Sequence, residues 1–213
     1  ALHPSYVMKV DDDTFIFIDE LLPKVHELNP PANNELAYIG RFDPIPPGAQ
    51  KPHRDKASQW YLSREEYAPD YFKPYAQGPA YLLSYDLART ICEMRRNKTL
   101  VDGLKLEDVS VGLWVDQVAQ LGLPVQYRPT STFHHYKCEE NSITAHYQSP
   151  AKMRCMWDRH TKGRSVLGRA LLSSRAPGGR GGDRPALPNG SRAAGRKLLT
   201  GGAFRTERFG RCC

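Results

Sequence analysis

The chain has 213 residues and a formal net charge of +7, and this charge is unevenly distributed. Residues 161–213 contain 12 Lys or Arg, 2 Asp or Glu and 11 of the 17 glycines, whereas residues 1–160 contain 18 basic and 21 acidic side chains. We therefore predict one domain over 1–160 and a basic, Gly/Arg-rich disordered tail over 161–213. Because the predicted domain has no basic excess, the composition gives no basis for specific nucleic-acid binding, and only the tail could bind polyanions.

The beginning of the chain suggests a segment cut from a longer protein. The first residue is alanine, and residues 6–10 already have the pattern of a strand. No apolar run reaches the roughly 18 residues that a membrane span requires. We therefore expect any membrane anchor to belong to a segment that is missing from this chain.

The first predicted element is a short strand at residues 6–10, which we expect to be buried and which leads directly into three aspartates at 11–13. Asp19 is positioned to cap a helix that reaches about residue 28. A second strand is expected at 37–42, followed by a loop rich in Pro and Gly. Polar chemistry at the end of a strand is typical of α/β proteins.

The second half of the predicted domain begins with an aromatic segment at 60–75. Ser84 is expected to cap a helix that follows a strand starting at residue 80, with Cys92 on its apolar face. The remaining elements are a helix at 106–120, extended segments at 125–127, 132–135 and 143–146, and a helix at 149–157. This order predicts a mixed α/β fold without internal repeats.

The five cysteines show no spacing typical of a zinc site. Cys138 and Cys155 flank one segment, and they could form a disulfide in an oxidising compartment.

The three consecutive aspartates, Asp11, Asp12 and Asp13, are the first candidate site. Their mutual repulsion costs several kcal/mol unless a cation or solvent relieves it. Carboxylate oxygens suit Mn²⁺ or Mg²⁺, and a bound diphosphate would complete the coordination sphere. The alternative is a solvated acidic turn that caps the next helix.

The second candidate site is the pair Glu107 and Asp108 at the start of a predicted helix. The partial positive charge of a helix N-terminus favours an ionised carboxylate. An ionised, oriented carboxylate can act as the general base that takes a proton from an attacking hydroxyl. Ordinary helix capping is the alternative.

Histidines and aromatic residues supply the third set of candidates. His146 ends an apolar strand and could provide nitrogen to a metal held by Asp13, although His134 and His135 are rivals for that role. The aromatic segment at 60–75 suits the apolar face of a sugar ring, yet aromatic side chains also form ordinary cores. Spacing alone decides neither choice.

Four segments occur together in one order: VMKVDDDTF (7–15), YAQGPAYLLS (75–84), EDVSVG (107–112) and ITAHYQSP (143–150). In this combination the chain resembles the β-1,3-galactosyltransferase family, glycosyltransferase family 31, over about residues 6–157. With Ala76 and Ser110 at these positions, the motifs are most similar to those of one branch of the family. This branch contains the proteoglycan-linkage galactosyltransferase and plant and algal relatives.

The resemblance implies a GT-A fold, of which this chain would hold the C-terminal catalytic half, with a mixed central sheet flanked by helices. It implies Mn²⁺-dependent, inverting transfer of galactose from UDP-galactose to a sugar hydroxyl of a glycan or glycoprotein, forming a β-1,3 linkage. UDP-N-acetylglucosamine is an alternative donor. The implied location is the Golgi membrane, with a lumenal catalytic domain on a single-pass type II anchor.

The resemblance also implies roles for individual residues. Asp13 would be the principal metal ligand, with His146 as the second protein ligand and Asp11 beside them, while Asp108 would be the catalytic base. Contacts to the donor or acceptor are implied for Asp12, Trp60, Tyr75, Gly78 and Glu107. Family members have a further α/β section before the Asp triplet, which builds much of the uridine site.

Two other classes of function remain open on the sequence. A metal-dependent hydrolase of phosphate esters could also use an Asp triplet and a histidine. A noncatalytic glycan-binding remnant would need none of the proposed chemistry.

Overall fold

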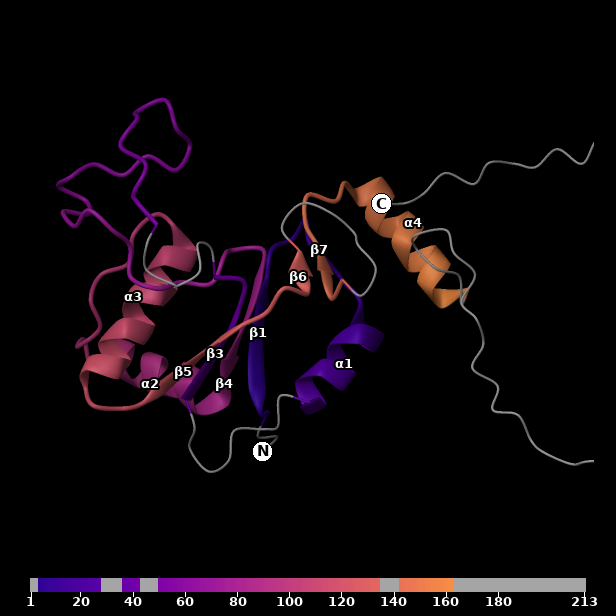
Figure 1. Ribbon diagram of the computed structural model, residues 1–213, viewed down its shortest axis with the longest axis horizontal. Coiled ribbons are helices and arrows are strands. Elements are labelled where there is room, and N and C mark those ends of the chain that lie inside the picture. Colours follow the sequence, from indigo (N-terminus) through magenta and orange to yellow (C-terminus); the bar gives the residue numbers. More distant parts are fainter. Residues whose placement is uncertain (1–3, 28–35, 43–49, 135–141, 163–213) are drawn as a thin grey trace, which may run out of the picture.

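The computed structural model describes residues 4–27, 36–42, 50–134 and 142–162 (Figure 1). The elements in chain order are β1 (Tyr6–Val10), β2 (Phe15–Ile16), α1 (Ile18–Glu27), β3 (Leu36–Gly40), β4 (Ala80–Ser84), α2 (Tyr85–Arg96), α3 (Glu107–Gln120), β5 (Val125–Pro129), β6 (Phe133–His134), β7 (Thr144–Ala145) and α4 (Pro150–Thr161). Most of the predicted tail, together with His135 and Cys138, lies outside the described residues.

The strands form two sheets. The larger has the order β1-β4-β3-β5, in which β4 is antiparallel to both neighbours and β3 is parallel to β5. The smaller has the order β2-β7-β6. The prediction of a mixed α/β fold with a mixed sheet is therefore confirmed.

Helices cover the larger sheet on both faces, because its inner strands are apolar at successive positions. All five residues of β3 are buried. Tyr38 packs in a cluster with α2 and α3, whereas Ala37 and Ile39 pack in a second cluster with Leu21 of α1. Side chains alternate between the faces of a strand, so a continuous apolar run supplies both cores. Figure 1 shows α2 and α3 on one side of the sheet and α1 on the other.

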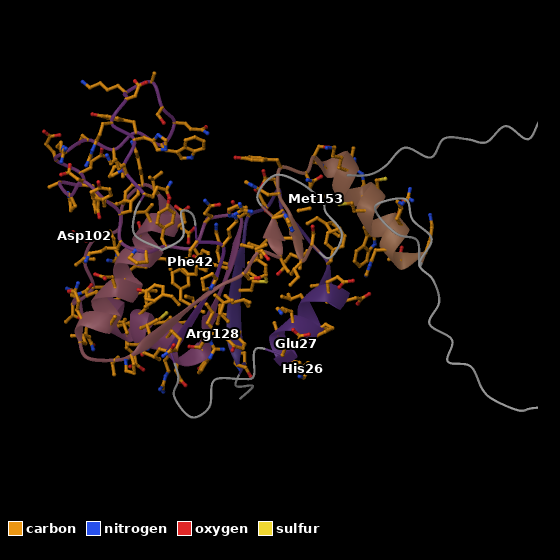
Figure 2. The ribbon with its side chains drawn as sticks, viewed as in Figure 1. His26, Glu27, Phe42, Asp102, Arg128 and Met153 are labelled. Carbon is orange, nitrogen blue, oxygen red and sulfur yellow. The ribbon has the colours of Figure 1, made fainter. Side chains whose placement is uncertain are left out.

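An aromatic group fills the core between the sheet and α3. Figure 2 labels Phe42 in this core. The ring centroid of Phe42 lies 5.2 Å from that of Tyr38 and 5.8 Å from that of Tyr127, both in edge-on geometry. Such contacts add to the stability that burial alone provides.

Ser84 caps α2, as its position predicted. Its hydroxyl accepts a hydrogen bond from the Leu87 backbone N–H at 3.4 Å and another from the Ala37 N–H at 3.0 Å, so the cap also ties the helix to β3. The prediction for Cys92 was wrong, because this side chain is exposed and Met94 completes the buried face instead. A helix repeat of 3.6 residues explains why Leu87, Ile91 and Met94 share one face.

The structure corrects two predictions near the start of the chain. Strand β1 is only half-buried and Val7 is 44% exposed, because β1 is the edge strand of its sheet within the described residues. Helix α1 begins at Ile18, so Asp19 lies inside the first turn instead of capping it. A carboxylate at that position still interacts favourably with the helix dipole.

Cys155 is disulfide-bonded, and its predicted partner Cys138 lies outside the described residues. Across the described ranges, none of the helices combines the length and apolar character needed to span a bilayer.

Arg54 organises the irregular segment at 50–77. Its guanidinium donates hydrogen bonds to the backbone carbonyls of Leu62, Ser63, Tyr67 and Pro69 at 2.7 to 2.9 Å. The planar fork of five N–H donors allows one side chain to hold several parts of a loop. This segment forms one wall of the candidate site.

Gly112 allows α3 to approach the end of that segment closely. A Cβ atom at Gly112 would lie 2.5 Å from Tyr75 Cβ and 2.7 Å from the Pro74 carbonyl oxygen. We expect Gly112→Ala to lower the free energy of unfolding by about 1–3 kcal/mol, because the backbone must shift to relieve the overlap. Urea denaturation measures this change.

Gly78→Ala is the matched control, since its Cβ would meet no atom closer than Asp108 Oδ2 at 3.4 Å. An unchanged midpoint for Gly112→Ala would contradict the close approach of α3.

Candidate functional site

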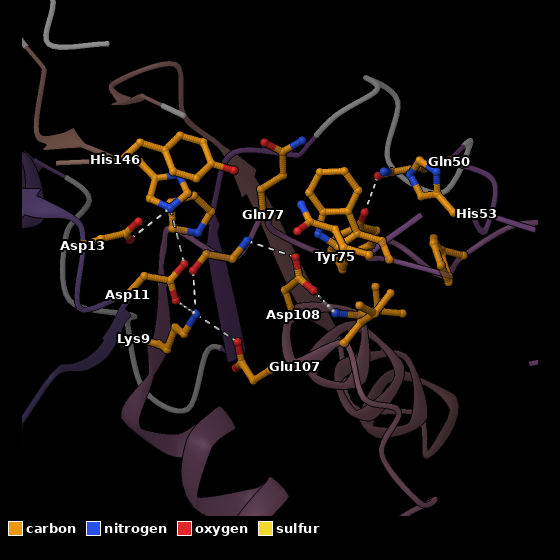
Figure 3. A pocket seen from close by; sticks show the side chains of 18 of the residues that line it. Lys9, Asp11, Asp13, Gln50, His53, Tyr75, Gln77, Glu107, Asp108 and His146 are labelled. Atoms are coloured by element: carbon orange, nitrogen blue, oxygen red, sulfur yellow. Dashed lines mark hydrogen bonds and ion pairs between the residues drawn. The ribbon is translucent and has the colours of Figure 1, made fainter. Parts of the chain in front are cut away.

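One cleft of about 610 Å³ contains all the site residues predicted from the sequence (Figure 3). It lies where the loop after β1, the N-terminus of α3, the turn after β7 and the segment at 50–77 meet. The predicted residues in its lining are Asp11, Asp12, Asp13, Trp60, Tyr75, Gly78, Glu107, Asp108 and His146.

Asp11, Asp13 and His146 form a compact group on one side of the cleft. Each offers one ligand atom within 4.8 Å of the others. His146 Nε2 lies 3.1 Å from Asp13 Oδ1 and 3.8 Å from Asp11 Oδ2 (Figure 3). His134 does not belong to this group, and His135 lies outside the described residues.

The smaller sheet brings these distant parts of the chain together. Phe15 in β2 pairs with Ala145 in β7, so His146 lies next to the loop that carries the aspartates. The Gln148 backbone N–H donates to the Asp13 carbonyl at 2.9 Å, and the Gln148 side-chain amide donates to the His146 carbonyl at 2.6 Å. The turn after β7 is therefore tied directly to the acidic loop.

This donor set fits a divalent cation. Two carboxylates and an imidazole suit Mn²⁺, and carboxylates also suit Mg²⁺. The imidazole is nearly buried, with 8% of its side chain exposed, whereas Asp11 and Asp13 are 35% and 42% exposed. An ion could therefore approach from the cleft and find the nitrogen ligand already positioned.

Lys9 connects the acidic group to the opposite side of the cleft. Its ammonium lies 2.5 Å from Asp11 Oδ1 and 3.0 Å from Glu107 Oε2, and it donates to the Gly78 carbonyl at 2.6 Å. Burial alone would lower the pKa of Lys9, but the hydrogen bonds and charges of Asp11 and Glu107 outweigh it and raise the pKa. Lys9 therefore stays charged and offsets part of the repulsion between the carboxylates.

Asp108 is held at the N-terminus of α3 by backbone donors. Its Oδ2 accepts from the Gly78 N–H at 3.1 Å and its Oδ1 from the Val109 N–H at 2.8 Å. Burial raises the pKa of the Asp108 carboxyl, and the negative charge of Glu107 adds to this, although the two N–H donors and Lys9 oppose it. The result is an oriented carboxylate with increased affinity for a proton.

Glu107 is held by two side chains, although its own side chain is 51% exposed. Besides its ion pair with Lys9, it accepts a hydrogen bond from the Tyr81 hydroxyl. Burial, followed by this hydrogen bond and the charge of Glu107, raises the pKa of Tyr81, so its hydroxyl remains a donor. Glu107 therefore helps to shape the cleft, and Asp108 is the carboxylate better placed to exchange a proton.

The two predicted aromatic surfaces differ. Trp60 is 45% exposed, and its ring centroid lies 5.6 Å from that of His53. Tyr75 is 9% exposed, packs in a core cluster and donates a hydrogen bond from its hydroxyl to Gln50 Oε1. Trp60 is therefore available to stack on a ligand, whereas Tyr75 mainly supports the wall behind it.

Sequence reasoning missed several residues of the cleft. Lys9 had a visible signal, because it is the one charged residue in an apolar strand. Gln77 and Tyr147 lie within two of the four quoted motifs but were given no role, whereas Gln50, His53 and Gln59 come from a loop without a periodic pattern.

Comparisons with known proteins agree with this picture. The family model described as Galactosyltransferase matches residues 1–121. Hydroxyproline O-galactosyltransferase GALT5 of Arabidopsis thaliana is 39% identical over 160 residues, which is 75% of this chain and 22% of that protein. Beta-1,3-galactosyltransferase 1 of Mus musculus is 34% identical over 161 residues, which is 72% of this chain and 45% of that protein.

The chain thus spans about a fifth of the plant relative and less than half of the mouse relative. Because the family model covers more than half of the 213 residues, the chain belongs to the galactosyltransferase family.

Proposed function

We propose that this chain carries the metal-binding and catalytic part of an inverting glycosyltransferase with a GT-A fold. The donor is UDP-galactose, and the acceptor is a hydroxyl group of a glycan or glycoprotein. One observation carries the proposal: Asp11, Asp13 and His146 converge in the same cleft that Asp108 lines from the other side.

Asp11, Asp13 and His146 would hold a Mn²⁺ ion in this cleft. When bound, the ion offsets negative charge on the departing diphosphate. Asp12 lines the cleft beside these ligands and would contact the donor. Lys9 keeps Asp11 in place from the other side, since its ammonium pairs with Asp11 Oδ1 and leaves Oδ2 facing His146.

Asp108 is the proposed general base. It accepts the proton of the acceptor hydroxyl as that oxygen attacks the anomeric carbon from the face opposite the diphosphate. A single displacement of this kind inverts the anomeric configuration. The Gly78 and Val109 N–H groups hold the carboxylate in place, which reduces the cost of aligning it in the transition state.

Two acceptors follow from the names of the relatives. A sugar hydroxyl corresponds to the beta-1,3-galactosyltransferases, and a hydroxyproline side chain corresponds to the plant hydroxyproline O-galactosyltransferases. In both cases Trp60, with its half-exposed ring, forms the surface on which the acceptor or the transferred sugar packs.

The proposed location is the Golgi lumen, with the intact protein anchored by a type II membrane segment. The disulfide at Cys155 supports an oxidising compartment. We propose a catalytic domain over 1–160, while the predicted basic tail over 161–213 lies outside the described residues beyond residue 162.

Release of UDP tests the proposed function. We expect the chain to release UDP from UDP-galactose when Mn²⁺ is present, and we expect a glycan or hydroxyproline-peptide acceptor to increase the rate. EDTA should abolish this release, because the diphosphate would lose its counter-charge. A coupled UDP assay measures the rate, and UDP-N-acetylglucosamine tests the alternative donor.

Other outcomes would support the rival functions. Release of inorganic phosphate without any acceptor would indicate a hydrolase. Binding of a glycan without turnover of either donor would indicate a noncatalytic remnant.

A further inference from the structure

Tyr147 has an unusual backbone conformation next to a candidate metal ligand. Its φ angle is +57°, and Lys98 is the one other non-glycine residue with a positive φ in the described ranges. For a residue with a Cβ atom this conformation costs about 1–2 kcal/mol. Such strain persists only where surrounding contacts determine the conformation.

The contacts on both sides of Tyr147 define this conformation. On one side, His146 is held by the pairing of β2 with β7 and by the Gln148 amide on its carbonyl. On the other side, the Gln148 N–H is bonded to Asp13, and Ser149 caps α4 by accepting from the Lys152 N–H. The backbone must reverse its direction between the fixed residues His146 and Gln148, and the positive φ angle of Tyr147 makes this turn.

The ring of Tyr147 stacks on the imidazole of His146. The two ring centroids are 3.8 Å apart and the ring planes differ by 25°. Tyr147 is nevertheless 52% exposed and lines the cleft. The exposed half of the ring contributes little to the core, while the stacked face packs directly on His146.

We propose that Tyr147 is a positioning residue for the metal site. Its ring restricts the imidazole of His146 to the orientation in which Nε2 faces Asp13 and Asp11 (Figure 3). A ligand that is already oriented loses less conformational freedom when the ion binds, which increases affinity. This inference rests on the proposed function in one respect, namely that His146 is a ligand of the metal.

Titration of the 213-residue chain with Mn²⁺, in the absence of any sugar nucleotide, tests the inference. Calorimetry gives the dissociation constant, and the electron paramagnetic resonance spectrum of the bound ion reports its environment. Tyr147→Phe keeps the ring and should bind Mn²⁺ within about twofold of the unchanged chain. Tyr147→Ala removes the stacking and should bind about 3- to 10-fold more weakly.

The variant Tyr147→Gly separates the effect of losing the ring from the effect of backbone strain. Glycine adopts a positive φ without strain, so this variant should be at least as stable to urea as Tyr147→Ala. Its Mn²⁺ affinity should nonetheless be reduced at least as much, because the ring is absent. Tyr71→Ala is the matched control, since Tyr71 is 50% exposed and lies outside the cleft lining, and it should leave Mn²⁺ affinity unchanged.

Two results would overturn the inference, and only the second would also overturn the metal site. If Tyr147→Ala binds Mn²⁺ as tightly as the unchanged chain, Tyr147 does not position His146, while the metal site stands. If the unchanged chain itself does not bind Mn²⁺, the metal assignment and the inference both fail.

Discussion

Asp108→Asn is expected to lower kcat by about 100- to 10,000-fold while the fold is retained, because general-base catalysis contributes roughly this factor. Asparagine has nearly the same size as aspartate but cannot accept the acceptor's proton. Both carboxylate oxygens of Asp108 accept a backbone N–H, from Gly78 and from Val109, so the asparagine NH2 group would face one of these donors and lose that hydrogen bond. Thermal unfolding of the variant measures this local cost separately from the loss of proton transfer. Steady-state kinetics with saturating donor and acceptor measures the loss.

The pH dependence of the reaction has a defined sign. Burial raises the pKa of Asp108 above its ordinary value of 3.8, and a base must be deprotonated to act. We therefore expect kcat/KM to rise with pH through a value above 3.8, and we expect Asp108→Asn to remove this rise. The contribution of the Asp108 carboxyl to folding stability changes with pH in the opposite direction. It is fully present below the pKa that the group has in the unfolded chain, and it is lost as the pH rises through the higher pKa of the folded chain.

Asp116→Asn provides the matched control for Asp108. Asp116 lies on the same helix but pairs with Lys73 and accepts from Gln120, outside the cleft lining. Its replacement should leave kcat unchanged. Full activity in Asp108→Asn would contradict the assignment of the base.

Asp13→Ala is expected to weaken Mn²⁺ binding by at least about 100-fold. Replacing a residue that only hydrogen-bonds to a metal ligand typically weakens metal binding by about 10- to 100-fold, and the loss of a direct ligand should exceed this. Galactosyl transfer should fall with it at Mn²⁺ concentrations that saturate the unchanged chain. The fold without metal should be preserved, because Asp13 is 42% exposed and belongs to a group of like charges. Calorimetry with Mn²⁺ and thermal unfolding without it measure the two effects.

Asp19→Ala offers a close comparison for Asp13. Asp19 also faces a histidine, with 3.3 Å between Asp19 Oδ2 and His160 Nε2, but this pair lies outside the cleft lining. We expect its replacement to leave Mn²⁺ binding unchanged. Equal Mn²⁺ affinities for Asp13→Ala and the unchanged chain would exclude Asp13 as a ligand.

The sequence by itself determined the features that depend on neighbouring residues. Helix α3 follows from an apolar pattern that starts after two acidic residues, and the Ser84 cap follows from one polar side chain before another such pattern. The aspartates at 11–13 are adjacent in the chain, so their mutual repulsion requires no fold to be recognised. The four ordered motifs also indicated the galactosyltransferase family, which the family model supports.

Tertiary structure decided which distant residues meet. Sequence reasoning left His134 and His135 as rivals of His146, and the pairing of β2 with β7 places His146 beside Asp13. The pattern at residues 6–10 indicated a buried strand, yet β1 is an edge strand, because burial depends on what lies alongside. The lysine within that strand joins Asp11 to Glu107, which no local rule predicts.

The physical reason for this division is the range of the interactions. Capping, helical periodicity and charge repulsion act over a few residues, so their effects can be recognised in the sequence. The packing of Tyr147 on His146 requires a turn that is fixed at both ends by contacts with the Asp loop and with α4. Only the folded chain brings those contacts together, and the same contacts determine the orientation of the imidazole.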